Sequence, residues 1–322
     1  MRVKVGLISR AVIRPLLRAL VTVWLAVTIA FWAVAALPGD AVSARFGPLS
    51  RISAERQAEI FVEMGLDRPL PIQYLNYLGN LITGDLGFSL QRNQAVTAML
   101  AQQFQYTLEI AALGLLFAVL LTLLGQIFKR GLTPWGASSR VSGLLDFAHT
   151  LAASTPSYWL GFLLLSLFAF SLKWLPSGGV ASPGSSILPA LTLAIPAAGY
   201  LGQVLDHELD RIELLPFALS SRARGMSRLR FTLTHGLKHS VSAVLGLLVN
   251  LIGGVLGGAV LVETVFARPG LGSLTLDAIV MRDMPVVLGV VALAATLFSA
   301  LTLLTQVTVR LLDPRLRGAV HG

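Results

Sequence analysis

The chain has 322 residues, of which 55 % are hydrophobic and only 13 % charged, and its mean hydropathy is +0.75. These polar residues are too few to cover the surface of a soluble domain. The composition therefore excludes an ordinary soluble domain and predicts membrane spans. The formal charge is +9, and the lack of cysteine excludes disulfides, cysteine-ligated metals and thiol nucleophiles.

Six apolar stretches are long enough to cross a hydrocarbon layer of about 30 Å, which takes roughly 20 helical residues. They are expected near 16–37, 106–128, 144–171, 187–205, 240–264 and 285–309. Pro189 and Pro196 interrupt the fourth stretch, although neighbouring helices make proline tolerable inside a membrane. The sequence therefore predicts an all-α integral membrane protein with six transmembrane helices.

Basic residues gather in alternate loops. The N-terminal tail, the loops after the second and fourth stretches and the C-terminal tail hold most of the 25 lysines and arginines. By the positive-inside rule, both termini face the cytoplasm, and an even number of spans requires the same. One alternative is open for the first stretch: "AVAA" at 33–36 resembles a signal-peptide cleavage site after a basic region.

Residues 38–105 form the expected outer segment. Ser53 can cap a helix over 54–64 that stops at Gly65, and Pro71 suits the first turn of a second helix that ends at Gly84. The apolar stripe expected on this second helix consists of Ile72, Leu75, Leu78 and Leu81. The chain thus divides into 1–37 (tail and first span), 38–105 (a small helical extracytoplasmic segment) and 106–322 (a five-helix core).

Catalytic motifs are scarce. No Gly-Lys pair forms a nucleotide P-loop, "HELDR" at 207–211 lacks the second histidine of a zinc motif, and no G-x-S-x-G elbow occurs. A membrane-embedded enzyme needs converging catalytic side chains within the spans, and none are evident. Glu109, Glu263 and His149 are the few ionisable groups expected in spans. Interfacial or hydrogen-bonded buried positions are the favoured interpretation, and the lining of a polar path is the alternative.

The fifth stretch contains "GGVLGG" at 253–258. Two small-xxx-small pairs overlap there and allow helices to approach closely in lipid. The pattern predicts helix packing, within the chain or across a dimer interface, and a bending gate is the alternative. The four residues are Gly253, Gly254, Gly257 and Gly258.

A basic loop at 206–239 precedes the fifth span. Gly225 can end a first short helix in the left-handed conformation, and Ser227 can cap a second. The apolar positions expected to face inward are Phe217, Leu219, Ala223 and Met226 in the first helix and Leu229, Leu233 and Leu237 in the second. Because the second helix runs into a span, it is not free to enter a DNA groove, so nucleic-acid binding is disfavoured. An electrostatic anchor on membrane lipid is the remaining simple alternative.

The sequence resembles the membrane permease subunits of binding-protein-dependent ABC importers, in the dipeptide/oligopeptide/nickel branch. The resemblance covers essentially the whole chain and is carried by "LPGD" (37–40), "GLDRPLPIQYLNYLGNLITGDLGFSL" (65–90), "TLEIA" (107–111), "STPSYWLG" (154–161), "WLPSGG" (174–179), "VETVFARPGLG" (262–272) and "LLDPR" (311–315). It implies a type I ABC importer permease fold.

The resemblance also implies that the basic loop carries the coupling helix, which docks on an ATPase subunit. Gly225 matches the signature glycine of the family, and the sequence departs from the pattern at Ser221, His239 and Ala243. The docking residues expected on this basis are Phe217, Leu219, Ser221, Arg222, Ala223, Arg224, Gly225, Met226, Ser227 and His235.

The implied assembly has a second permease subunit (a distinct homologue), two cytoplasmic ATPases that hold ATP and Mg, and an extracytoplasmic substrate-binding protein. This chain is expected to lie in the plasma membrane, to bind no cofactor and to catalyse no reaction. Di-, tri- and oligopeptides and nickel chelates are all open as cargo, and no substrate-binding residue can be placed. An ion-coupled secondary transporter or channel is the alternative function; it predicts inverted repeats or paired charges within spans, which are not evident.

Overall fold

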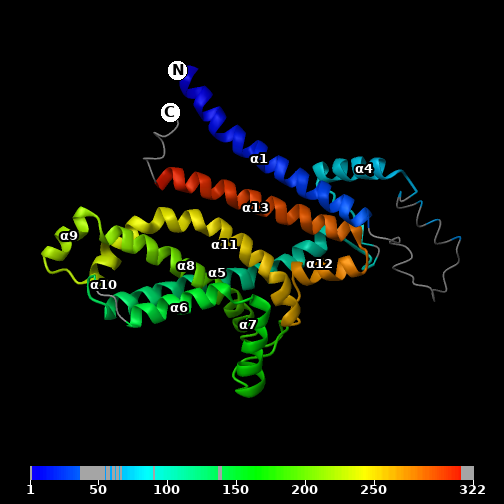
Figure 1. Ribbon diagram of the computed structural model, residues 1–322. Helices are drawn as coiled ribbons and strands as arrows, with labels where there is room; N and C mark the ends of the chain where they lie inside the picture. Colours follow the sequence, from blue (N-terminus) through cyan, green and yellow to red (C-terminus); the bar gives the residue numbers. More distant parts are fainter. Residues whose placement is uncertain are drawn as a thin grey trace. The chain divides into compact units, whose positions relative to one another are not determined.

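A computed structural model describes residues 2–36, 67–89, 91–136 and 140–312, together with Glu55, Glu59, Val62 and Gly65. The helices in these parts are α1 Arg2–Ala35, α4 Leu70–Thr83, α5 Val96–Leu132, α6 Arg140–Ser154, α7 Ser157–Leu164, α8 Ile187–Glu213, α9 Pro216–Ala223, α10 Arg228–Phe231, α11 Leu237–Val265, α12 Leu271–Val280 and α13 Met284–Leu312 (Figure 1). Two segments are π-helical, η1 Leu165–Ser171 and η2 Thr232–Gly236. The short strands β1 Phe88–Ser89 and β2 Gln94–Ala95 pair antiparallel, with Phe88 opposite Ala95.

Within the described residues, five helical segments are long and apolar enough to cross a membrane. They are Ile13–Ala35, Val96–Leu132, Ile187–Glu213, Ala243–Val265 and Met284–Gln306. The sixth candidate is the pair Arg140–Ser154 and Ser157–Ser171, which passes the same test together. All six predicted stretches coincide with these elements, and the prediction of an all-α membrane fold is confirmed.

The predicted third span is bent rather than straight. α6 and α7 meet at 105°, with Thr155 and Pro156 between them. Pro156 takes an extended ψ of 131° and stands at the N-cap of α7, and a proline has no N–H with which to continue the helix from α6. An unbroken helix across 144–171 is therefore wrong.

The fourth span, in contrast, is continuous through both of its prolines. Pro189 lies in the first turn of α8, where its missing N–H has no helical partner to lose, and Pro196 lies inside the helix. α6, α7 and α11 all pack against α8, and 61 % of its most apolar stretch is buried, more than in the other four single-helix candidates. These neighbours hold the helix together across Pro196.

Two glycines let α6 approach α8 closely. A Cβ at Gly199 would lie 2.5 Å from the Ala153 backbone nitrogen, and one at Gly202 would lie 2.6 Å from the His149 ring. α6, α8 and α11 run side by side in Figure 1. The core shared by α8 and α11 includes Leu193, Ala197 and Leu251.

Two compact units make up the chain, the first comprising residues up to Tyr106 with Ser273–Leu303 and the second Thr107–Gly272 with the remaining C-terminal residues. In the first unit, α4 packs on α1: the ring centroids of Tyr74 and Phe31 lie 5.3 Å apart. The Tyr74 hydroxyl also lies 2.7 Å from Thr28 Oγ1.

The inward face of α4 differs from the predicted stripe. Ile72 and Leu75 are exposed, whereas the partly buried positions are Tyr74, Tyr77, Leu78 and Leu81. Tyr74 fits this face because its ring is partly buried while its hydroxyl meets Thr28, whereas the Tyr77 hydroxyl is buried without a hydrogen-bond partner among the described residues. Pro71 in the first turn and Gly84 at the C-cap, with φ +80°, are as predicted.

The preceding helix, predicted over 54–64, lies almost wholly outside the described residues, as does its cap Ser53. Gly65 has φ +66°, as expected for a residue that ends a helix. Neither the β-hairpin nor α12 was predicted. Arg92 in the hairpin turn pairs with Asp277 of α12 at 2.7 Å, which fastens the hairpin within the first unit.

Candidate functional site

Residues 214–236, termed the elbow, connect α8 to α11. α9 begins at Pro216 and ends before Gly225, whose φ is +78°. The Gly225 N–H donates to the Arg222 carbonyl (2.9 Å), and the Met226 N–H donates to the Ser221 carbonyl (3.2 Å). Ser227 then caps α10 by accepting a hydrogen bond from the Arg230 N–H. The predicted turn, with a left-handed glycine and a serine cap, is present.

The turn requires glycine at position 225 because of the backbone conformation there, and not because a side chain would lack room. Within the described residues, a Cβ built at this position would meet no heavy atom within 4 Å. The cost of a side chain there is therefore the strain of positive φ, which is largest for β-branched residues.

The inner face of the elbow is a small apolar core. Ile212, Ala218 and Phe231 are buried, and Trp135 packs against them from the end of α5. The Trp135 Nε1–H donates to the Met226 carbonyl at 2.9 Å. This core holds α9 and α10 against the helical bundle.

The predicted inner faces are partly wrong. Phe217 and Met226 are half-buried as expected, but Leu219 and Ala223 are exposed. In the second helix Leu229 and Leu237 are half-buried as expected, but Leu233 is exposed, and the fully buried positions are Phe231, Thr232, Gly236 and Ser240. The π-helical turn at η2 changes the angular spacing, so a 3.6-residue period fails there.

The outer face of the elbow combines apolar and cationic side chains. Leu214 is 80 % exposed and Leu219 is 56 % exposed. The other predicted docking residues that face outward are Arg222, Ala223, Arg224, Gly225 and Ser227. His235 is half-buried and stacks on Phe231. Exposed leucines bordered by guanidinium groups are typical of a protein-docking surface.

Ser221, where the sequence departs from the family pattern, is accommodated. It is buried, and its hydroxyl donates to the Phe217 carbonyl at 2.9 Å. The hydroxyl is therefore satisfied within its own helix, and the residue is small enough to let α9 lie against its core.

A network of buried charges joins the elbow to three helices. Arg228 at the start of α10 pairs with Glu213, and Arg130 of α5 pairs with the same carboxylate. Arg130 also contacts Asp206 at 3.0 Å, and Lys129 contacts Asp206 at 2.8 Å. Lys129 reaches α6 as well, through Asp146 at 2.5 Å. Through these charges α10 is linked to α8, and α8 is linked to α5 and α6.

Sequence reasoning missed this network because it counted Lys129 and Arg130 as loop charges. α5 continues to Leu132, and the side chain of Arg130 is fully buried. A signal was present: Asp206, Asp210 and Glu213 are spaced four and three residues apart, which places three acids on one face of α8.

Two of the three ionisable groups expected in spans follow the hydrogen-bonded interpretation. Glu263 is buried and accepts bonds from the Thr107 hydroxyl (2.5 Å) and the Gly272 N–H (2.8 Å). Glu109 pairs with Arg268 at 2.5 Å. His149 differs: its Nδ1 lies 3.7 Å from Asp206 Oδ2, beyond hydrogen-bond distance, and makes no hydrogen bond within the described residues.

Asp146, His149 and Asp206 lie close enough to hold a metal ion, with ligand atoms within 4.8 Å of one another. The Lys129 ammonium donates to both carboxylates, however. A cation from the chain itself already neutralises the pair, so these residues do not fit a metal centre.

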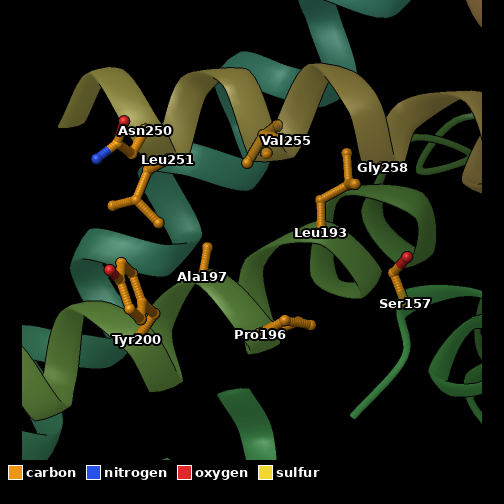
Figure 2. A pocket seen from close by; sticks show the side chains of 10 residues that line it. Ser157, Leu193, Pro196, Ala197, Tyr200, Asn250, Leu251, Val255 and Gly258 are labelled. Carbon is orange, nitrogen blue, oxygen red and sulfur yellow. The ribbon is translucent and has the colours of Figure 1, made fainter. Parts of the chain in front are cut away.

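The glycines of α11 do not share one environment. A Cβ at Gly258 would lie 3.3 Å from Leu193 Cδ2, whereas one at Gly254 or Gly257 would meet no heavy atom of the described residues within 4 Å. Gly254 and Gly258 line a cavity of about 500 Å³ between α7, α8 and α11 (Figure 2). Packing within the chain is thus seen at Gly258, and the open positions remain available to a ligand or a partner.

Comparison with known proteins agrees with this architecture. The model of the binding-protein-dependent transport system inner membrane component matches residues 135–318, and its N-terminal counterpart matches 8–111. A protein of Brucella suis that carries a provisional peptide permease name is 30 % identical, over 91 % of this chain and 94 % of its own length.

Two further relatives cover the chain to a similar extent. The glutathione transport system permease protein of Pectobacterium atrosepticum is 30 % identical over 95 % of this chain and 98 % of its own length. The dipeptide transport system permease protein of Lactococcus lactis is 28 % identical over 92 % and 96 %. With a family model matching more than half of its length and relatives spanning nearly all of it, the chain belongs to the binding-protein-dependent transport system inner membrane components, the permease subunits of ABC transporters.

Proposed function

We propose that this chain is one of two permease subunits of an ATP-driven peptide importer, and that the elbow is its docking site for an ATPase subunit. The observation that carries the docking assignment is the outer face of the elbow, where Leu214 and Leu219 are exposed beside Arg222 and Arg224. An exposed leucine costs free energy in water, which burial against a partner recovers. Apolar and basic side chains together also suit a lipid headgroup surface, and an ATPase is the proposed partner because the chain belongs to the permease subunits of ABC transporters.

Peptides are the proposed cargo because the relatives are named for peptide, dipeptide and glutathione transport. A binding protein would deliver the peptide from outside, and the second permease would be a homologue of this one. Nickel chelates have no support among these relatives. ATP and Mg would be held by the ATPase subunits, and this chain would carry out no bond chemistry.

The proposed orientation places both termini and the elbow in the cytoplasm. It follows from the excess of lysine and arginine in the tails and in the loops after the second and fourth spans. The docking assignment requires the same orientation, because ATP is cytoplasmic.

The test is purification of the intact membrane complex followed by reconstitution into proteoliposomes with the binding protein. The proposal predicts that ATPase subunits and a second permease co-purify, and that peptide uptake requires ATP. Purification without an ATPase, or uptake driven by an ion gradient alone, would contradict it. The second outcome would restore the alternative of an ion-coupled carrier.

A further inference from the structure

The cavity between α7, α8 and α11 has the size of a small-ligand site. Its volume is about 500 Å³, within the range of roughly 300–1,000 Å³ for small-molecule pockets. Figure 2 shows Leu251 of α11 and Ala197 of α8 facing the space between the two helices, with Tyr200 at one side. These helices are two of the candidate membrane spans, so the cavity lies within the spanning part of the second unit.

Its lining carries no charge. The residues are Ser157, Leu193, Pro196, Ala197, Tyr200, Asn250, Leu251, Gly254, Val255 and Gly258. Only Ser157, Tyr200 and Asn250 have polar side chains, and their hydroxyl and amide groups can donate and accept hydrogen bonds. The space is half open, because Asn250 and Gly254 are exposed, but an ionised group held against its apolar walls would still lose water without gaining a counter-charge, which costs free energy.

Gly254 contributes space: it faces the cavity, and a Cβ there would touch no heavy atom of the described residues within 4 Å. The site therefore combines hydrogen-bonding groups for an amide with room for an apolar side chain.

We propose that this cavity is a transit subsite that receives an uncharged side chain of the peptide during translocation, while Asn250 and Tyr200 bond the adjacent peptide amides. The proposal rests on the peptide-importer function above. It makes this chain a filter for side-chain size and charge that acts after the binding protein has released its cargo.

Gly254→Leu tests the proposal because the substitution fills the cavity without a clash in the chain. In proteoliposomes with the same binding protein, we expect the uptake ratio of trileucine to trialanine to fall about tenfold, the scale at which apolar pockets discriminate side-chain size. Gly257→Leu is the matched control, since Gly257 is equally open but is not part of the lining. That variant should keep the wild-type ratio.

A second variant tests charge. Asn250→Asp places a carboxylate in the cavity and should raise the uptake of trilysine relative to trileucine, whereas Asn250→Gln should not. Unchanged ratios in Gly254→Leu and Asn250→Asp, or equal changes in Gly257→Leu, would overturn the subsite while leaving the importer intact. Wild-type complexes that take up none of the peptides would instead overturn the proposed function itself.

Discussion

Arg228, the first residue of α10, donates from Nε to both carboxylate oxygens of Glu213, the last residue of α8, at 2.9 and 3.0 Å. Arg228 also donates to the Thr133 hydroxyl at the end of α5, at 2.8 Å. Because both side chains of the ion pair are largely buried, water screens their attraction little. The relationship makes the elbow a rigid extension of the helical bundle rather than a loose loop.

Replacing Arg228 should therefore loosen the elbow. For Arg228→Ala we expect a loss of about 1.5–3 kcal/mol, the range for charged hydrogen bonds, together with weaker stimulation of the ATPase by substrate. Thermal unfolding of the purified complex and the ATPase assay measure the two effects. Arg230→Ala is the control, because Arg230 is exposed and is not one of the predicted docking residues, so this variant should leave the unfolding temperature unchanged. Equal unfolding temperatures for the two variants would contradict the structural role of the pair.

Gly225 gives a test that separates backbone conformation from side-chain volume. Gly225→Val should insert and fold but lose transport, because a β-branched residue resists φ +78°. Gly225→Asn should retain much of the activity, since asparagine visits the left-handed region and the position has open space. ATP-dependent peptide uptake compares the variants. Equal loss in both would show that the elbow needs the bare surface of glycine rather than its conformation.

Glu263 and the loop that wraps around it should be intolerant of change. Gly272→Ala would bring a Cβ to 2.3 Å from Val260 Cα, and Glu263→Ala would leave the Thr107 hydroxyl and the Gly272 N–H without this acceptor. Each variant should lower thermal stability, with about 1–3 kcal/mol expected for an unsatisfied buried group. Gly257→Ala, in the same helix as Glu263, should be neutral. A stable Gly272→Ala protein would show that the close approach to Val260 can relax.

Orientation can be measured with single cysteines, because the chain has none of its own. Cysteine at Leu219 should react with a membrane-impermeant maleimide only from the cytoplasmic side, and cysteine at Leu75 only from the outside. Both positions are exposed, at 56 % and 64 %. Labelling of both from one side would contradict the proposed topology.

Local signals in the sequence were enough for much of this structure. About 20 apolar residues in a row mark a span whatever surrounds them, and the roles of Gly225 and Ser227 depend only on their own backbone. The tertiary features needed information from other segments. Pro156 ends a helix while Pro196 does not, because three neighbouring helices support α8.

In the candidate site, too, local features could be predicted from the sequence and tertiary features could not. Its position and turn could be predicted, but the fully buried residues Phe231 and Thr232 could not, since the π-helical turn at Thr232–Gly236 changes the period. The buried charges at Lys129 and Arg130 were missed because a sequence does not show that α5 continues past its apolar core to meet the acids of α8. The cavity was also beyond prediction, because residues from α7, α8 and α11 form it together.

The central claim is that the elbow docks on an ATPase, and site-directed photo-crosslinking tests it most directly. A benzophenone maleimide on a single cysteine at Leu219 should, in the intact complex, crosslink this chain to an ATPase subunit, identified by mass spectrometry. The same probe at Leu75 should give no ATPase product. A crosslink from Leu219 to lipid alone, or to no ATPase subunit, would contradict the docking assignment.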